Sequence, residues 1–267
     1  MIQERVQVRY NTIECSGYYR MGLTCHSDYR RAKPGQFVML RVVDGMNPLL
    51  RRPFSIHRLI RSSAGAVEGL EILYKVVGTG TERLADCRRG DGLNLLGPLG
   101  RPFSLPERPA QVFIAAGGIG VAPMYFLTET LQKKGFDISS CVVFIGGRSK
   151  DDLLCMNDFF AIGVKTVNIT TDDGTAGEQD VVTGPIERAV KEGRPDVIYA
   201  CGPLPMLRAT ARMARRYDIP CQISIETMMG CGIGACLGCA VSAAGGGDKY
   251  LHACVDGPVF NAADIDL

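Results

Sequence analysis

The sequence predicts a small antiparallel β-barrel, then an α/β domain with a five-stranded parallel sheet, then a small cysteine-rich domain. Three observations lead to this prediction. Residues 1–104 contain six short apolar segments separated by turns and no long helical pattern. Residues 105–222 alternate strand and helix patterns, as βαβ units do. Residues 223–267 carry four cysteines at metal-ligand spacing.

The composition limits the classes of function. The chain has 267 residues, of which 46% are hydrophobic, so it can bury substantial cores, and its length suggests about two domains. A formal net charge of +2 favours neither nucleic acid nor an anionic membrane as a partner. The N-terminus alternates apolar and charged residues, so no signal peptide is predicted. The sequence contains no run of eighteen apolar residues, so no membrane-spanning helix is predicted.

The chain has eleven cysteines, an odd number. Seven lie outside the C-terminal motif, mostly in apolar or helical surroundings where a reduced cysteine acts as a small hydrophobic residue. These are Cys15, Cys25, Cys87, Cys141, Cys155, Cys201 and Cys221. We therefore expect a reducing, cytoplasmic environment.

The barrel is predicted from short segments that end at Pro, Gly or Asn turns. The predicted strands are residues 6–15, 18–25, 36–43, 54–62, 70–77 and 92–98. Residues 51–55 (RRPFS) place cations, a ring and a hydroxyl at the start of a strand, which suits a diphosphate and a flat flavin ring. An ordinary strand entry with a packed Phe54 fits the same residues, so this choice stays open.

A second candidate contact follows the fifth strand. Residues 78–81 (GTGT) join that strand to a short predicted helix, and the free amide groups at a helix start suit a phosphate. Thr81 could equally serve only as a helix cap. The turn is weak evidence when taken alone.

The α/β domain begins after a proline-rich joint near residue 105. Its predicted strands are 112–116, 141–146, 164–170, 196–200 and 221–225, and its predicted helices are 122–134, 150–160, 183–193 and 204–218. Ligands bind such sheets at the carboxyl ends of the strands. Residues 117–123 (GGIGVAP) and 201–203 (CGP) lie there, although the first loop has proline where a GxGxxG motif has its third glycine. Glycine loops of this kind also occur for packing alone.

The C-terminal cysteines have the spacing C-x4-C-x2-C, followed after fourteen residues by the fourth. They are Cys231, Cys236, Cys239 and Cys254. This spacing is typical of plant-type [2Fe–2S] ligation. The glycines between them let backbone amides turn toward sulfur. A structural zinc site is the alternative, although zinc ribbons usually pair two short cysteine knuckles.

Taken in order, RRPFS, GTGT, GGIGVAP, CGP and CGIGACLGC…CVDGPVF resemble the ferredoxin–NADP reductase superfamily. Within it, the chain is most similar to the electron-transfer subunits of the NAD-dependent, iron–sulfur type of dihydroorotate dehydrogenase. The resemblance covers nearly the whole chain. It implies an FAD-binding barrel over 1–104, an NAD-binding α/β domain over 105–222 and a [2Fe–2S] domain over 223–267.

The resemblance also implies roles for single residues. The FAD contacts would be Arg52, Pro53, Phe54, Ser55, Leu73, Tyr74, Lys75, Gly80 and Thr81. The nicotinamide contacts would be Gly118, Gly120, Pro123, Cys201, Gly202 and Pro203. Glu226 matches an acidic position near the flavin edge and is the predicted catalytic residue. Phe54 stands where many members have tyrosine, and Thr227 and Gly230 also depart from the expected pattern.

The implied cofactors fix an order of electron transfer. Nicotinamide exchanges a hydride, a [2Fe–2S] cluster exchanges single electrons, and FAD can do both, so FAD belongs between them. No dihydroorotate site is visible in the sequence. The resemblance therefore implies an FMN-bearing catalytic subunit as partner, in an assembly of two copies of each chain, which would pass electrons to NAD+ in pyrimidine biosynthesis.

Some questions stay open at this stage. A related reductase serving ferredoxin or a sulfur-reducing partner, a redox sensor, and a zinc-stabilised binding module are alternative functions. Arg148 and Lys150 could attract the 2′-phosphate of NADP or be solvated surface residues. His57 and His252 fit a packed or exposed histidine better than a ligand, and their roles are not assigned. The apolar residues near the cluster either pack inward or form a docking surface; they are Met228, Met229, Ile233 and Leu237.

Overall fold

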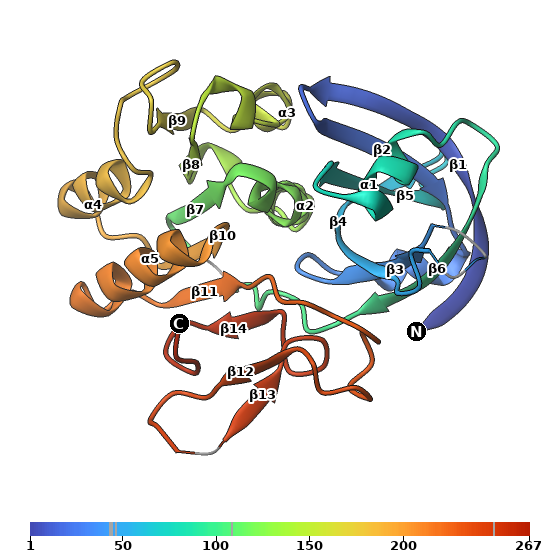
Figure 1. The fold of residues 1–267 in the computed structure, drawn as a ribbon. Coiled ribbons are helices and arrows are strands. Elements are labelled where there is room, and N and C mark those ends of the chain that lie inside the picture. Colours follow the sequence, from blue (N-terminus) through green and yellow to red (C-terminus); the bar gives the residue numbers. More distant parts are fainter. Residues whose placement is uncertain (43–44, 46, 108, 248) are drawn as a thin grey trace.

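The computed structural model describes residues 1–42, 45, 47–107, 109–247 and 249–267. The first part of the chain is a closed antiparallel barrel with the strand order β1-β2-β5-β4-β3-β6, which confirms the predicted barrel (Figure 1). Its strands are β1 (Ile2–Cys15), β2 (Tyr18–Thr24), β3 (Phe37–Arg41), β4 (Arg52–Arg61), β5 (Val67–Lys75) and β6 (Gly92–Leu99). The predicted third strand ended at residue 43, which lies outside the described residues.

Strand β1 is longer than predicted, because it begins at Ile2 rather than at residue 6. Its first half pairs with β6 and its second half pairs with β2. A register shift between Val8 and Tyr10 marks the point where the strand changes partner. Such irregularities bend a strand. The bend in β1 lets this strand pair with both β6 and β2, which closes the barrel.

The second part is a sheet with the strand order β14-β11-β10-β7-β8-β9. Five strands are parallel, as predicted: β7 (Val112–Gly117), β8 (Cys141–Gly147), β9 (Thr166–Thr171), β10 (Val197–Cys201) and β11 (Cys221–Ser224). The sixth, β14 (Val259–Asn261), was not predicted and pairs antiparallel with β11. A three-residue strand is too short to show a sequence period, and only its tertiary neighbour defines it.

The helices agree with prediction in all but one region. They are α1 (Thr79–Ala85), α2 (Val121–Lys133), α3 (Met156–Ala161), α4 (Thr183–Glu192) and α5 (Leu204–Arg216). The helix predicted over residues 150–160 is instead a short 3-10 turn at Lys150–Asp152 followed by α3. Cys155 separates the two with a left-handed φ of 61°, which no α-helix interior tolerates. None of the described helices has the length and apolarity needed to cross a membrane.

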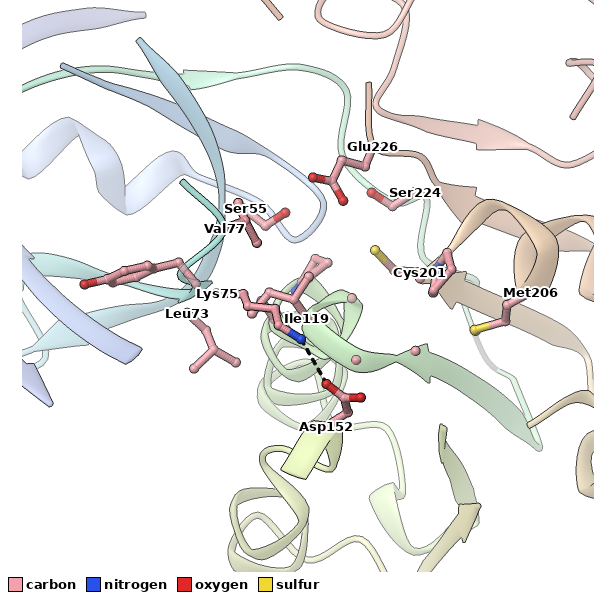
Figure 2. Close-up of a pocket in the computed structure, with 18 of the residues that line it drawn as sticks. Ser55, Leu73, Lys75, Val77, Ile119, Asp152, Cys201, Met206, Ser224 and Glu226 are labelled. Atoms are coloured by element: carbon pink, nitrogen blue, oxygen red, sulfur yellow. Dashed lines mark hydrogen bonds and ion pairs between the residues drawn. The ribbon is translucent and has the colours of Figure 1, made fainter. Parts of the chain in front are cut away.

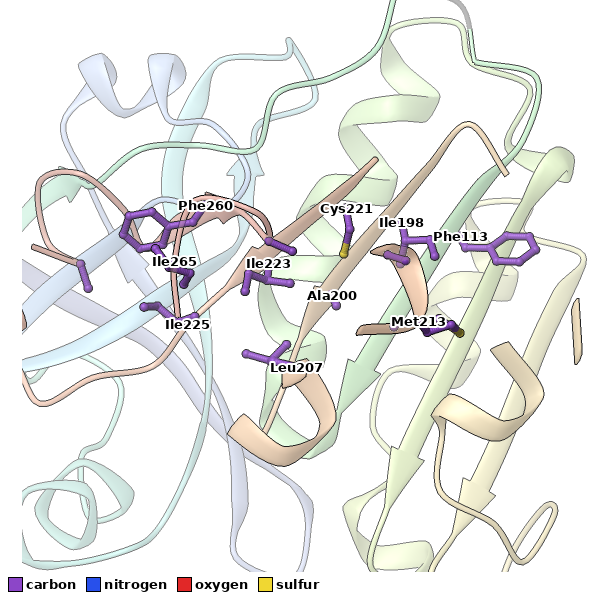
Figure 3. Close-up of a cluster of buried hydrophobic side chains, with 14 of the residues drawn as sticks. Phe113, Ile198, Ala200, Leu207, Met213, Cys221, Ile223, Ile225, Phe260 and Ile265 are labelled. Atoms are coloured by element: carbon purple, nitrogen blue, oxygen red, sulfur yellow. The ribbon is translucent and has the colours of Figure 1, made fainter. Parts of the chain in front are cut away.

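The C-terminal segment lies between the barrel and the sheet, below both in Figure 1. It contains the hairpin β12 (Ala240–Ser242) and β13 (Tyr250–His252) before it adds β14 to the sheet. One apolar core runs from Phe113 on β7 through Ile223 to Phe260 on β14 (Figure 3). The same core includes Cys239 and Cys254. The cysteine-rich segment is therefore anchored in the main core.

Candidate functional site

A cleft of about 1080 Å³ lies between the barrel and the sheet. Its lining includes every residue predicted to contact FAD or nicotinamide, from Arg52 on β4 to Pro203 before α5, and also Glu226. Figure 2 shows side chains reaching into the cleft from both parts of the molecule. The structure thus brings together motifs that are about 170 residues apart in the sequence. A large cleft between two parts of a fold is a common place for ligands to bind.

A cation and a helix start meet on the barrel side of the cleft. The Arg52 guanidinium donates a 2.6 Å hydrogen bond from Nη1 to the carbonyl of Leu50. It also lies against Gly80, where an added Cβ would approach Arg52 Nε to 3.2 Å. The absence of a side chain at Gly80 therefore lets Arg52 lie beside the first turn of α1. A guanidinium and free helix amides together suit a diphosphate.

The hydroxyl of Thr81 holds the turn before α1. It donates to the Gly78 carbonyl at 2.9 Å and accepts from the amides of Val77 at 2.9 Å and Gly78 at 3.2 Å. The structure thus supports the structural role that the sequence left open for Thr81, because its hydroxyl is already engaged. The backbone amides at Thr79 and Gly80 remain the phosphate-binding candidates of this turn.

An apolar wall stands next to this corner. The rings of Phe54 and Tyr74 meet edge to face with centroids 5.9 Å apart, and Leu73 lies beside Tyr74 on β5. Tyr74 donates a hydrogen bond to Asn11 Oδ1 at 3.0 Å, which fixes the ring. Phe54 needs no such partner. The missing hydroxyl at this position therefore leaves no unsatisfied polar atom.

Two glycine loops touch on the sheet side. A Cβ at Gly120 would lie 2.3 Å from the carbonyl oxygen of Cys201, and one at Gly202 would lie 3.0 Å from Gly117 Cα. At Gly120 no other residue type permits this approach, because the three nearest atoms are backbone atoms of Cys201 and Gly202. At Gly202 an added Cβ would also lie 2.7 Å from Met206 Sδ. The loops lie at the carboxyl ends of β7 and β10, the edge at which parallel sheets bind ligands.

Four polar side chains converge between the two sides in Figure 2: Ser55 on β4, Cys201 on β10, and Ser224 and Glu226 at the end of β11. Desolvation raises the pKa of the Cys201 thiol to about 12. The thiol is therefore protonated at neutral pH and can act as a weak hydrogen-bond donor rather than as a nucleophile. Glu226 is exposed, so its carboxylate contacts solvent as well as the cleft.

Sequence reasoning missed an ion pair that crosses the cleft. Lys75 Nζ on β5 lies 3.1 Å from Asp152 Oδ1 and 2.7 Å from the hydroxyl of Tyr18. Desolvation opposes ionisation of Asp152, but hydrogen bonds from Tyr18 and Lys75 lower its pKa to about 2. The pair therefore persists throughout the neutral range. The only sequence signal for Asp152 was its position after the second strand of the sheet. The helix predicted over residues 150–160 included Asp152, so its contact with Lys75 was not expected.

Arg148 and Lys150 differ in their positions. Arg148 lines the cleft, its side chain is 79% exposed, and its Nε lies 3.4 Å from Asp152 Oδ2. Lys150 does not line the cleft.

Two further lining residues, Thr170 and Thr227, carry buried hydroxyls without a hydrogen-bond partner among the described residues. Both were missed by sequence reasoning and leave polar groups that a bound cofactor can satisfy.

The four C-terminal cysteines come together in one loop region, and all are free thiols. The Sγ atoms of Cys239 and Cys254 are 3.2 Å apart, close enough to bind one metal ion. Backbone amides approach the sulfurs: Ile233 and Cys236 lie 3.4 Å from Cys231 Sγ, and Gly234 lies 3.2 Å from Cys254 Sγ. Inward-pointing amides stabilise thiolates and fit an iron–sulfur cluster.

The turns that aim these amides depend on glycine. Gly232 and Gly234 have φ values of 76° and 81°, which favour glycine. Desolvation opposes ionisation of Cys231, but hydrogen bonds from the Ile233 and Cys236 amides lower its pKa to about 6. The loop therefore stabilises a thiolate before any metal is considered.

Apolar side chains around this loop face solvent. Met228 is 89% exposed, Leu237 is 58% exposed, and Ile233 and Val255 are each 47% exposed. We call these four residues the cluster-loop patch. Met229, by contrast, packs against the main core. Exposed apolar residues gathered near a metal-ligand loop are typical of a protein-docking surface.

Two family models match the chain. Residues 226–266 match the iron–sulfur cluster binding domain of dihydroorotate dehydrogenase B. Residues 113–212 match the oxidoreductase NAD-binding domain. The first match contains the four cysteines and the second contains both glycine loops.

Curated relatives match over most of the chain. The chain is 40% identical over 232 residues to the electron transfer subunit of dihydroorotate dehydrogenase B (NAD(+)) from Desulforamulus reducens, covering 86% of each protein. It is 37% identical over 267 residues to the subunit of the same name from Bacillus caldolyticus, covering 99% of each.

Solved structures share the architecture. An NADH-dependent reduced ferredoxin–NADP oxidoreductase, studied for flavin-based electron bifurcation, superposes with a TM-score of 0.83 at 27% identity, over 97% of this chain and 89% of that one. A ferredoxin NADP+ reductase from Neisseria gonorrhoeae superposes with a TM-score of 0.64 at 16% identity, over 80% of this chain and 91% of that one, and shows the fold alone.

The contact between the two glycine loops gives a first test. Gly120→Ala should reduce stability by about 1–3 kcal/mol, because its Cβ would overlap backbone atoms of Cys201 that cannot move aside. Gly193→Ala is the matched control, since its Cβ would meet only Gln111 Oε1, at 3.6 Å. Urea unfolding measures both variants. Equal midpoints would show that the loops have room for a side chain.

Proposed function

Since the chain belongs to the family of electron-transfer subunits of NAD-dependent dihydroorotate dehydrogenase B, we propose that it carries electrons from the catalytic subunit through a [2Fe–2S] cluster and FAD to NAD+. The full-length likeness carries the assignment. The gathering of all the predicted FAD and nicotinamide contacts in one cleft supports the route. Family membership decides against the ferredoxin-linked reductase, redox-sensor and zinc-module alternatives.

We propose that FAD occupies the barrel side of the cleft. Arg52 and the backbone amides of Thr79 and Gly80 in the first turn of α1 would hold its diphosphate, and Pro53, Ser55, Phe54, Leu73 and Tyr74 would border its ring. The barrel side of the cleft fits FAD chemically, since it offers a cation, free helix amides and an apolar surface. The buried hydroxyl of Thr227 can satisfy one further polar atom.

The nicotinamide dinucleotide would bind at the two glycine loops, with Gly118, Gly120 and Pro123 on one side and residues 201–203 on the other. A bound flavin exchanges a hydride with nicotinamide and single electrons with an iron–sulfur cluster. The neutral Cys201 thiol and the Ser55 hydroxyl would orient the nicotinamide ring. Glu226 would pass protons between solvent and the cleft, a role that its exposure and its position in the cleft lining support.

The net reaction balances with this arrangement. Dihydroorotate gives up two electrons and two protons to become orotate. NAD+ takes up the two electrons and one proton as a hydride, and the second proton passes to solvent. The chain needs a catalytic partner for the first half. We propose that this partner carries FMN and docks on the cluster-loop patch, in an assembly of two copies of each chain. The exposed side chains of Met228 and Leu237 support this choice of face.

We also propose the division into a flavin domain (1–104), a nucleotide domain (105–222) and a cluster domain (223–267). A cytoplasmic location is part of the proposal, since all eleven cysteines are free thiols. The NAD preference that the relatives' names state is consistent with Arg148, whose guanidinium is already engaged by Asp152.

Loss of Arg52 should weaken FAD binding. Charge-assisted contacts of this kind contribute about 1.5–3 kcal/mol, so Arg52→Ala should raise the FAD dissociation constant about tenfold or more. Arg61→Ala, an exposed arginine at the far end of the same strand, is the control and should leave the constant unchanged. Flavin fluorescence during dialysis measures retention. Equal retention by both variants would remove Arg52 from the FAD site.

Iron content tests the cluster ligands. The wild-type chain should contain two irons and two acid-labile sulfides, and Cys254→Ala should lose most of both, because three thiolates hold the cluster incompletely. Cys221→Ala removes another buried thiol and should retain the cluster. Elemental analysis and the visible spectrum measure this. Stoichiometric zinc without iron in the wild type would contradict the assignment.

Charge on the cluster-loop patch tests the partner. The isolated chain should oxidise NADH with artificial acceptors and be inert toward dihydroorotate, and it should reduce NAD+ from dihydroorotate only with the catalytic subunit. Leu237→Asp should weaken that complex at least tenfold, because a carboxylate replaces an apolar contact. Ile13→Asp, 68% exposed on β1 of the barrel, is the control. Dihydroorotate oxidation by the isolated chain, or unchanged binding of Leu237→Asp, would contradict the proposal.

A further inference from the structure

A second cluster of ligand-type side chains lies away from the cleft lining, where the barrel meets the sheet domain. His57 on β4, Cys155 before α3 and Asp158 in its first turn each offer one donor atom, and these three atoms lie within 4.8 Å of one another. His57 is fully buried and Cys155 is 8% exposed. None of the roles assigned above uses these residues.

The histidine is set up as a ligand. Its Nδ1 lies 3.0 Å from the carbonyl oxygen of Ala122, and an acceptor there requires that Nδ1 carry the hydrogen. The lone pair is then on Nε2, which has no hydrogen-bond partner among the described residues. The ring stacks on Tyr125 at 4.9 Å, so it cannot turn away. Metal-binding histidines commonly have their other nitrogen held in this way.

The backbone brings the other two donors to the same place. Cys155 has a left-handed φ of 61°, an uncommon conformation for a residue other than glycine, and makes no side-chain cap for α3. Asp158 follows three residues later on the same helix face. The strain positions a thiol and a carboxylate against His57. Backbone strain of this kind tends to occur at functional sites.

The charges around the three donors leave room for a cation. Glu14, Glu71 and Asp158 face the guanidinium groups of Arg20 and Arg58, so the network carries one net negative charge. A divalent ion bound to a Cys155 thiolate adds one net positive charge and neutralises the network. Arg20 donates to Asp158 Oδ2 at 2.6 Å, and a carboxylate has a second oxygen for a metal.

We propose that His57 Nε2, Cys155 Sγ and an Asp158 carboxylate oxygen bind one Zn²⁺ ion. Nitrogen, thiolate and carboxylate are the donors that zinc prefers. The fourth position would hold water or Glu71, whose Oε1 lies 3.7 Å from Nε2. The Cys155 thiol releases its proton to solvent when the metal binds, and no electron is transferred. The donors must close to about 3–4 Å apart to share the ion.

Such an ion would join the barrel to the nucleotide domain. His57 belongs to β4, whose first residues face the proposed flavin, and it is bonded to α2, whose first turn carries Pro123 of the nicotinamide loop. Zinc would fix these two elements relative to each other. The Asp158 side chain is 30% exposed, which gives the ion a route from solvent. This proposal does not depend on the proposed electron route.

The test uses the chain loaded with FAD and its iron–sulfur cluster, so that the C-terminal cysteines are occupied. After incubation with ZnCl₂ and desalting, elemental analysis should find one zinc per chain at unchanged iron. Cys155→Ala should weaken zinc binding by more than the 10–100-fold that loss of an outer-shell partner costs. The matched control is Cys141→Ala, a buried thiol on β8, which should bind zinc as the wild type does.

A second measurement guards against misfolding of the variant. Zinc should raise the thermal midpoint of the loaded wild type and of Cys141→Ala but not that of Cys155→Ala, because a ligand stabilises only the state that binds it. Asp158→Asn, at a partly exposed position, should lose the same shift. Absence of zinc in the loaded wild type, or equal zinc in Cys155→Ala, would overturn the proposal.

Discussion

The packing of helix α2 against strand β4 is the contact on which the cleft depends. The His57 ring of β4 is bonded to the Ala122 carbonyl and stacked on Tyr125, both on α2. The same strand begins with Arg52 and Ser55, and the same helix begins just after Gly120. One buried contact therefore sets the distance between the RRPFS strand entry on β4 and the glycine loop before α2. A shift of either element would change the separation of the two walls of the cleft.

The C-terminal segment is fixed by two neighbours rather than one. Strand β14 joins the sheet beside β11, and Gly232 of the cysteine loop packs so closely on Met39 of the barrel that a Cβ would lie 2.7 Å from its Cγ. Cys239 and Cys254 are part of the main apolar core. A cluster held by these residues cannot move relative to the cleft without breaking core packing. This rigidity suits electron transfer, which needs a fixed separation more than it needs motion.

The sequence predicted the features that local chemistry determines. The glycine loops, the RRPFS strand entry and the cysteine spacing each require particular residues within a few positions, so their signals are visible in one dimension. The Lys75–Asp152 pair and strand β14 exist only through tertiary contact. The same holds for the buried hydroxyls of Thr170 and Thr227, which have no hydrogen-bond partner among the described residues. The predicted helix over 150–160 failed for the same kind of reason. Cys155 is buried and has a left-handed φ of 61°, and a helix propensity scale does not register such a tertiary placement.

The four cysteines differ in exposure, so the cysteine loop region has one exposed edge and one buried edge. Cys236 is exposed and Cys231 half-buried, whereas Cys239 and Cys254 are buried. The exposed edge carries Leu237 with a left-handed φ of 59°, so the loop holds an apolar side chain outward at some backbone cost. The inner edge belongs to the core shared with the sheet. Glu226 and Met229, which precede Cys231 in the chain, line the cleft. A cluster held by the four cysteines would therefore have its outer edge at Cys236 and its inner edge toward packed protein, and a partner at the outer edge would leave the cleft open.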